Sequence, residues 1–290
     1  MDVSSIAFSV LSIGGLGLVF GVGLSYASKI FAVESDPRVE QVLECLPGAN
    51  CGGCGYPGCA GCADAIVAGT APVNACPVGG AVAAEKIAAV LGVEATASEP
   101  MAAFVHCGGT CEKAKEKYDY QGITDCVMAS QLAGGGYKSC SYGCLGLGTC
   151  KAACAFGAIE IVDGVAVIDK DKCVACGKCV SACPKHIIEL LPAKKKVKVQ
   201  CASKDKGKDV LAACSAGCIA CKMCEKECKF DAIHVIDNIA VIDYDKCKNC
   251  GMCANKCPKK VITGYRVAPP APPKPAEPAP APAAEAPKAE

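Results

Sequence analysis

The chain has 290 residues, of which 27 are cysteine and none is tryptophan, and its formal net charge is +1. So many cysteines would indicate a disulfide scaffold in a short secreted chain, but this chain is long, and its cysteines are odd in number and closely grouped. We therefore expect reduced thiols that bind metal, in small domains that depend on the metal for folding. The near-neutral charge and the lack of supporting motifs give no indication of nucleic-acid binding.

The N-terminal segment predicts a transmembrane helix within residues 1–28. Residues 3–28 contain no charged side chain, and about 20 apolar residues suffice to cross a hydrocarbon core of about 30 Å. A cleaved signal peptide is the alternative, but no Lys or Arg precedes the apolar run, which is also long for such a peptide. Because Lys29 and Arg38 follow the span and only Asp2 precedes it, the C-terminal part should lie in the cytoplasm.

A first cysteine group predicts a single-cluster domain over residues 29–95. Its ligands follow the spacing Cys51-x2-Cys54-x4-Cys59-x16-Cys76, and glycines surround the first three. Glycine suits a loop that must wrap closely and aim its amide groups at sulfide. Cys45 and Cys62 remain unassigned here, and an Ala-rich helix is expected between Gly80 and Gly92.

Two later runs have the form Cys-x2-Cys-x2-Cys-x3-Cys-Pro. This spacing is the bacterial ferredoxin signature, in which three thiolates bind one [4Fe-4S] cluster and the fourth binds its neighbour. Zinc is a weaker alternative, because zinc ribbons use separated Cys-x2-Cys pairs. The two runs are Cys173, Cys176, Cys179, Cys183 and Pro184, and Cys247, Cys250, Cys253, Cys257 and Pro258.

The chain repeats itself with an offset of 74 residues. Each copy has a cysteine loop, a β-hairpin with its turn at Asp163-Gly164 or Asp237-Asn238, and then a ferredoxin run. So many matching positions indicate two ferredoxin-like modules, over residues 96–191 and 192–266. The predicted class is thus α+β: small Fe–S domains behind a transmembrane helix, with a disordered Pro/Ala-rich tail over residues 267–290.

The crossing rule predicts the ligands of each module. Three sets are complete: Cys218, Cys221, Cys224 and Cys257; Cys228, Cys247, Cys250 and Cys253; and Cys154, Cys173, Cys176 and Cys179. In the remaining set, Leu147 occupies the position of Cys221, beside Cys144, Cys150 and Cys183. Cys140 is the nearest candidate for the missing ligand, and a three-iron cluster is the alternative.

Five further cysteines could contribute to a sixth cluster in addition to the five [4Fe-4S] clusters expected above. The spacings Cys126-x13-Cys140 and Cys201-x12-Cys214 are nearly equal, which suggests that the extensions preceding the two modules approach each other. The alternative is that these cysteines are structural thiols. The five are Cys107, Cys111, Cys126, Cys201 and Cys214.

Other features limit the chemistry. No dinucleotide or Walker motif is present, so we expect no NAD or flavin site in this chain and no catalytic residue. The three histidines, His106, His186 and His234, are expected to be surface or structural residues. Residues 194–260 carry 15 lysines and 8 acidic residues, whereas residues 29–193 carry 12 basic and 17 acidic residues. The distal module could therefore attract an acidic partner, or its lysines could simply form a solvated face.

Together these features resemble the B subunit of the Rnf complex. The resemblance rests on the glycine-studded N-terminal helix, the Cys51–Cys76 group and paired ferredoxin modules that contain Gly143-Cys144-Leu145-Gly146-Leu147-Gly148. It implies an electron-transfer subunit of an ion-translocating ferredoxin:NAD oxidoreductase that takes electrons from soluble ferredoxin and passes them to other subunits. It also implies a single-pass protein of the cytoplasmic (inner) membrane, with its clusters on the cytoplasmic side. The alternative is an electron-relay subunit of another membrane enzyme, of the hydrogenase or formate dehydrogenase type.

Overall fold

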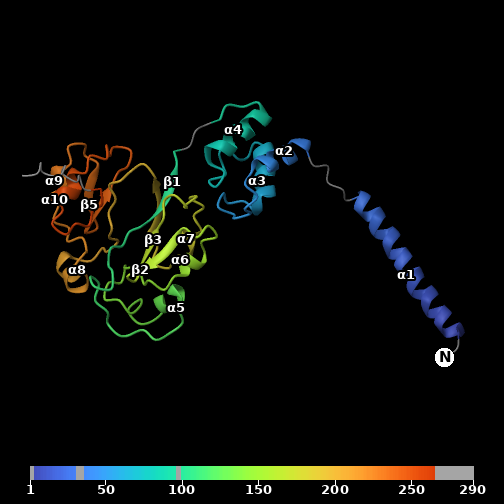
Figure 1. Cartoon of the computed structure of the whole chain (residues 1–290), viewed down its shortest axis with the longest axis horizontal. Coiled ribbons are helices and arrows are strands. Elements are labelled where there is room, and N and C mark those ends of the chain that lie inside the picture. The colour runs from blue at the N-terminus through green and yellow to red at the C-terminus, as the bar shows by residue number, and fades with distance from the viewer. Residues whose placement is uncertain (1–2, 31–35, 96–98, 265–290) are drawn as a thin grey trace, which may run out of the picture. The chain divides into compact units, whose positions relative to one another are not determined.

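The computed structural model describes residues 3–30, 36–95 and 99–264, and the chain divides into two compact units, Met1–Ser98 and Glu99–Glu290. Figure 1 labels their helices and strands. The first unit contains α1 Val3–Ile30, α2 Pro37–Cys45, α3 Gly58–Val67 and α4 Gly80–Leu91. The second contains β1 Met101–Val105, α5 Cys126–Ser130, α6 Thr149–Ala152, β2 Ile159–Val162, β3 Val165–Ile168, α7 Lys178–Ala182, β4 Ile188–Pro192, α8 Gly207–Ala213, α9 Met223–Glu227, β5 Ile233–Ile236, β6 Ile239–Ile242 and α10 Met252–Lys256.

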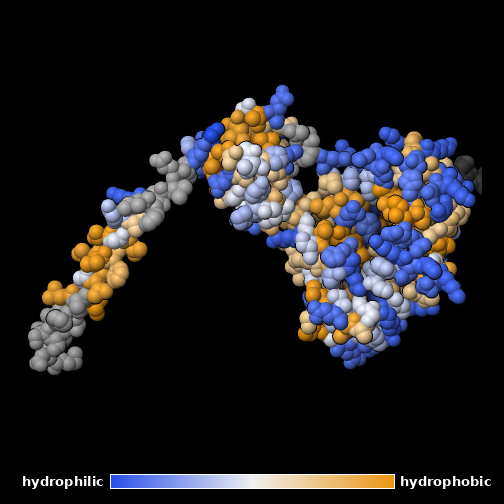
Figure 2. Space-filling view, turned by 180° about the vertical axis from the view of Figure 1, so that it is seen from behind, coloured by the Kyte–Doolittle hydropathy of each residue, from blue (hydrophilic) through white to orange (hydrophobic). Residues whose placement is uncertain are grey.

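The first helix, α1, coincides with the predicted membrane span. Leu16, Phe20 and Leu24 are exposed on it, and Figure 2 shows apolar side chains along its described part. The side chains of residues 3–10, 12 and 30 lie outside the described set. Among the residues that are described, no helix is both long enough and apolar enough to cross a membrane. The predicted tail, residues 267–290, also lies outside the described residues.

Three short helices form the rest of the first unit. Helix α2 begins with Pro37 after the N-cap Asp36, whose carboxylate accepts the amide of Arg38, so the first turn is capped. Helix α4 confirms the predicted Ala-rich helix and ends at Gly92, whose φ of +67° allows the left-handed C-terminal turn. The three helices bury a common core that contains Val42 and Ile87, both fully buried.

Ile87 offers a test of how far this core stabilises the first unit. We expect Ile87→Ala to lower the free energy of local opening by about 2–5 kcal/mol, because a buried isoleucine is lost and leaves a cavity. Val82→Ala is the matched control on the same helix, since Val82 is 65% exposed and should change the value by less than about 0.5 kcal/mol. Native-state hydrogen exchange of the amides of α3 and α4 measures both. Equal exchange rates in the two variants would show that α4 contributes nothing through this side chain.

Over its described residues, 99–264, the second unit contains three two-stranded antiparallel sheets, and two of them confirm the predicted hairpins. The β2–β3 turn has positive φ at Asp163 and Gly164, and the β5–β6 turn has positive φ at Asp237 and Asn238. Two consecutive positive φ values match the twist of the flanking strands, as in type I′ turns. The 74-residue repeat is therefore a structural repeat as well.

The third sheet joins segments that are far apart in the sequence. Strand β1 pairs with β4, from Met101 opposite Pro192 to Val105 opposite Ile188. In the second copy, an isolated bridge between Val199 and Ile262 takes the place of the last of these pairs. Each copy has its own apolar core, in which side chains of the hairpin pack against the cysteine loops.

Candidate iron–sulfur sites

In the first unit, three of the four predicted ligands, Cys54, Cys59 and Cys76, belong to one cluster of packed side chains. Cys59 lies in the first turn of α3, and its amide donates to the side-chain oxygen of Asn50 at 2.8 Å. The amide of Gly79 donates to the sulfur of Cys76 at 3.4 Å. Gly58 has φ +87°, and a Cβ there would lie 2.9 Å from the Asn50 oxygen, so this loop requires glycine. These interactions hold Cys59 and Cys76 in place.

The two unassigned cysteines of this unit lie in its core. Cys62 is 1% exposed, and Cys45 packs against the same cluster of apolar side chains. Burial, a hydrogen bond with Cys54 and the nearby Cys76 raise the pKa of the Cys62 thiol to about 12. Cys62 therefore lies in the core, beside the predicted ligands Cys54 and Cys76.

In the second module, each predicted set of four cysteines lines one cavity. Each cavity has a volume of about 20 Å³. Backbone amides point at the sulfurs, as from Ala232 to Cys228 and from Asn249 to Cys247, both at 3.4 Å. The first cavity is lined by Cys218, Cys221, Cys224 and Cys257, and the second by Cys228, Cys247, Cys250 and Cys253.

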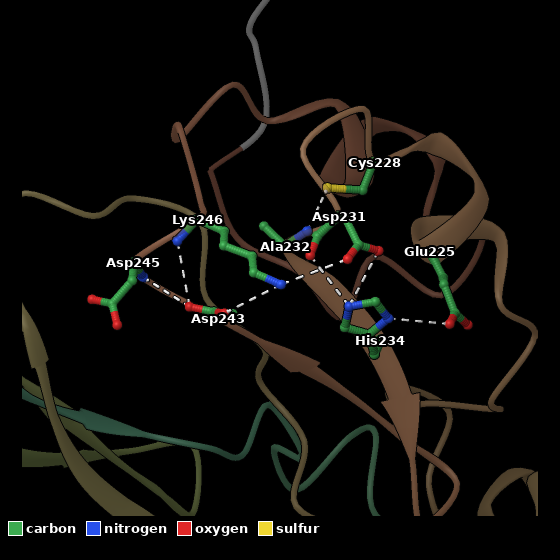
Figure 3. Close-up of polar contacts among 8 residues, drawn as sticks. All are labelled: Glu225, Cys228, Asp231, Ala232, His234, Asp243, Asp245 and Lys246. Atoms are coloured by element: carbon green, nitrogen blue, oxygen red, sulfur yellow. Dashed lines mark hydrogen bonds and ion pairs between the residues drawn. The ribbon is translucent and has the colours of Figure 1, made fainter.

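A polar network holds the loop that follows Cys228 (Figure 3). His234 lies between Glu225 and Asp231, with ring nitrogens 3.4 Å from a carboxylate oxygen of each. Lys246 reaches the carboxylate of Asp231 at 3.6 Å. The contacts of His234 are thus those of a structural residue. The same holds for His106, whose Nδ1 lies 2.8 Å from the carbonyl oxygen of Val199.

In the first module, the complete set gathers around α7. Burial and then the neighbouring sulfurs of Cys173, Cys176 and Cys154 raise the pKa of Cys179 to about 11. The amide of Ala103 on β1 donates to the Cys173 sulfur at 3.4 Å. The four cysteines that the crossing rule groups together are therefore neighbours.

For the incomplete set, the structure places a different cysteine beside the three predicted ligands. Cys126 lines the cavity of about 20 Å³ that Cys144, Cys150 and Cys183 also line, whereas Cys140 does not. Burial and then the nearby sulfurs of Cys144, Cys126 and Cys183 raise the pKa of Cys150 to about 12. Four cysteines thus line this site.

Hydrogen bonds explain why Cys126 reaches this site. Its amide donates to the hydroxyl oxygen of Thr149 at 2.7 Å, and that hydroxyl donates to the carboxylate of Asp125 at 3.0 Å. Asp125 also caps α5 by accepting the amide of Met128. Because Thr149 directly precedes Cys150, these bonds attach the start of α5 to the ligand loop, and α5 lies next to α6 in Figure 1.

Leu147, which replaces a cysteine of the other copy, packs against the same segment. It contacts a small apolar cluster that contains Cys126, Tyr137 and Leu145. The sequence carried one signal for this exchange, because position 200, which lies 74 residues after Cys126, is glutamine. The first copy therefore lacks one cysteine and gains another that has no counterpart.

The cysteines predicted for the sixth site also separate. Cys107, Cys201 and Cys214 line a common cavity, and Cys140 joins them there. Cys126 and Cys111 do not line it. The Cys111 side chain is exposed, and its amide donates to the carbonyl of Asp163 at the β2–β3 turn.

Burial disfavours thiolates at these sites when no metal is present. It raises the pKa of Cys201, Cys224 and Cys253 to about 11 in each case. Among the described residues, no three or more His, Cys, Asp or Glu side chains are grouped so that they could hold a metal ion. We therefore identify the sites by three features: cavities that cysteines line, backbone amides that donate to their sulfurs, and sulfurs that lie near one another.

Comparisons with known proteins match iron–sulfur families in parts of both units. A family model described as "Putative Fe-S cluster" matches residues 46–78, and one described as "4Fe-4S binding domain" matches residues 166–189 and 240–263. A relative in Acetobacterium woodii is 51% identical over 90% of this chain and 79% of its own length. It is named as the B subunit of the Na(+)-translocating ferredoxin:NAD(+) oxidoreductase complex.

Two further relatives give the same result. The B subunit of the ion-translocating oxidoreductase complex of Methanosarcina acetivorans is 49% identical over 88% of this chain and 96% of its own length. The B subunit of the proton-translocating ferredoxin:NAD(+) oxidoreductase complex of Clostridium ljungdahlii is 46% identical over 86% and 90%, respectively. At this identity and coverage, the chain belongs to the family of B subunits of the ion-translocating oxidoreductase, or Rnf, complexes.

Proposed function

We propose that this chain accepts electrons from a reduced soluble ferredoxin and passes them to other subunits of an ion-translocating ferredoxin:NAD oxidoreductase. The observation that carries the proposal is the series of cysteine-lined cavities in the second unit, which has the ligand pattern of ferredoxins. The names of the relatives support the identity of the complex. We also propose the α+β class for the two modules.

Five sets of cysteines would hold the clusters. Each [4Fe-4S] cluster, when bound, accepts and returns one electron at a potential tuned by burial and by hydrogen bonds to sulfur. The protein contributes the thiolates, the amide donors and the exclusion of water. The proposed sets are Cys51, Cys54, Cys59 and Cys76; Cys126, Cys144, Cys150 and Cys183; Cys154, Cys173, Cys176 and Cys179; Cys218, Cys221, Cys224 and Cys257; and Cys228, Cys247, Cys250 and Cys253.

We place the entry of electrons at the site that contains Cys221. Cys221 is an exposed member of its set, and Lys222 beside it also lines the cavity. Lys226 on α9 and Lys256 on α10 are exposed on two helices that contact each other. The basic balance of residues 194–260 has the sign that attracts an acidic ferredoxin.

Stopped-flow reduction by an acidic ferredoxin tests this entry site. We expect the second-order rate constant to fall about tenfold or more between low and physiological salt, because screening weakens long-range attraction. The double variant Lys226→Glu/Lys256→Glu should be slow already at low salt. Lys172→Glu/Lys178→Glu makes the same charge change on exposed lysines of the first module and should react like the wild type. A rate that does not depend on salt would refute electrostatic docking.

The N-terminal helix is proposed as a single-pass anchor in the cytoplasmic membrane, with the clusters on the cytoplasmic side. The support is the uncharged stretch over residues 3–28, followed by Lys29 and Arg38. A variant that starts after residue 35 should be released from washed membranes when it is expressed without the other subunits. If the full chain is released equally by an alkaline wash, this segment is not an anchor.

A further inference from the structure

We propose that Lys198 sets the reduction potential of the cluster that the complete set of the first module would bind, by placing a buried positive charge beside it. The inference rests on the proposed function of the chain as an iron–sulfur electron carrier. It adds a residue that is not a metal ligand and that neither matching family model covers. The set consists of Cys154, Cys173, Cys176 and Cys179.

The ammonium of Lys198 is buried without a partner of opposite charge. Lys198 is 1% exposed and is one of two buried lysines among the described residues. The other, Lys138, donates to the carbonyls of Gly109 and Gly164, at 3.3 and 2.8 Å. The ammonium of Lys198 has no hydrogen-bond partner in the described part of the chain, and no carboxylate pairs with it there. Burial of an unpaired charge is costly, so contacts within the protein leave this position unexplained.

The side chain of Lys198 reaches from the second module to the first. Its ammonium lies 5.0 Å from the centre of the Phe104 ring on β1, and the attraction between them offsets part of the cost of burial. Ala103, the neighbour of Phe104 on that strand, donates its amide to the Cys173 sulfur at 3.4 Å. Strand β1 therefore contacts both the buried lysine and a ligand of the proposed cluster.

The electrostatic surroundings connect Lys198 with the same ligand. Burial, and then the positive charge of Lys170, lower the pKa of Lys198 to about 8, whereas the nearby Cys173 acts in the opposite direction. The pKa stays above 7, so Lys198 is positively charged at neutral pH. Cys173 favours this charge, and a cluster held by four thiolates, which is negative overall, would favour it more strongly.

The backbone fixes Lys198 at the junction of the two modules. Its amide donates to the hydroxyl oxygen of Thr263 at 3.1 Å, and its carbonyl accepts the amide of Thr263 at 2.8 Å. Close by, the amide of Gly108 donates to the carbonyl of Gln200 at 3.0 Å. The same junction contains the cavity lined by Cys107, Cys140, Cys201 and Cys214. A charge attached in this way stays at the site and does not turn to solvent.

The repeat supplies this charge in one copy only. The bridge at Val199 is the counterpart of the last pair of the β1–β4 sheet, at Val105. Lys198 directly precedes the first of these valines. Phe104 directly precedes the second. The two side chains that contact each other thus hold equivalent positions, one charged and one apolar.

A positive charge beside an iron–sulfur cluster favours its reduced form, which carries one more negative charge. In each cycle one electron enters the site and one leaves it, no bond forms or breaks, and Lys198 keeps its proton. The ammonium therefore raises the reduction potential and makes this site a better acceptor of electrons from the other sites of the chain.

Potentiometric titration of the full chain, purified without oxygen and followed by EPR, tests this role. We expect Lys198→Met to lower the equilibrium constant for reduction of this cluster at least about tenfold, which corresponds to about 59 mV for one electron. Iron and sulfide content should not change, because methionine packs in the same space and an unpaired buried charge is removed. The signal that Cys176→Ser alters identifies the cluster. An unshifted potential in Lys198→Met overturns the proposal.

Two further variants separate charge from packing. Lys198→Arg keeps the charge and should keep a potential close to that of the wild type. Lys196→Met removes an exposed charge two residues away, and water and salt should screen its effect. The proposal is wrong if Lys196→Met shifts the potential as much as Lys198→Met does, or if Lys198→Arg does so.

Lys198→Gln keeps the test decisive if methionine causes loss of the cluster. Glutamine retains a polar end without a charge, so the potential should fall here too, and a wild-type potential would contradict the proposal. Failure of the proposed function would appear differently. Chemical mediators set the potential in this titration, so a chain that ferredoxin cannot reduce would still show the shift.

Discussion

Removal of iron from the full chain is expected to abolish the fold of the second unit. Its strands have four or five residues, and α5, α6, α7, α9 and α10 have at most five. Helices this short do not form alone, and a two-residue-turn hairpin is marginal without further packing. The cysteines would then line empty cavities. Binding of the clusters therefore supplies much of the folding free energy.

Circular dichroism and hydrogen exchange check this result. After anaerobic oxidation and chelation, we expect the β2–β3 and β5–β6 amides to exchange within the dead time, a loss of protection of at least about a thousandfold. Reconstitution with iron and sulfide should restore protection, which separates loss of the cluster from irreversible damage. Retained protection in the iron-free chain would show that the apolar cores alone fold the modules.

Cys126→Ala is expected to damage the cluster bound by Cys144, Cys150 and Cys183. With three thiolates left, the site should lose either one iron, which gives a three-iron EPR signal in the oxidised protein, or about four irons per chain. Cys183→Ala should affect the same signal, and the double variant should lose no more iron than the more damaged single variant, because the two residues serve one site. Iron analysis with EPR of the oxidised and reduced protein measures these effects.

Two other cysteines serve as controls for this assignment. Cys111→Ala should retain all iron, because its side chain is exposed outside the cluster cavities described above. Cys140→Ala should leave the signal assigned to Cys126 unchanged, because Cys140 lines the cavity at the junction of the modules. If Cys140→Ala and not Cys126→Ala alters that signal, the sequence-based assignment is right and the structural one is wrong.

The sequence by itself determined the features that depend on local spacing. The ferredoxin runs specify three ligands within one loop, so Cys247, Cys250 and Cys253 could be grouped without a structure. The hairpins followed from β-branched strands around turn residues, as at Asp163-Gly164. The crossing rule then predicted the fourth ligand of each complete set.

Only the tertiary structure decided where cysteines from separate segments meet. Sequence spacing supports Cys126 and Cys140 in similar ways. The hydrogen bonds through Thr149 hold Cys126 at the cavity that Cys144, Cys150 and Cys183 line. The amide of Ser139 donates to the carbonyl of Lys115, so the segment before Cys140 lies along the segment that contains Lys115. Cys140 itself lines the cavity at the junction of the two modules. These contacts join residues far apart in the sequence, and their geometry depends on the packing of the whole unit. Local spacing carries no information about such packing, because many chain paths between the same cysteines satisfy it equally well.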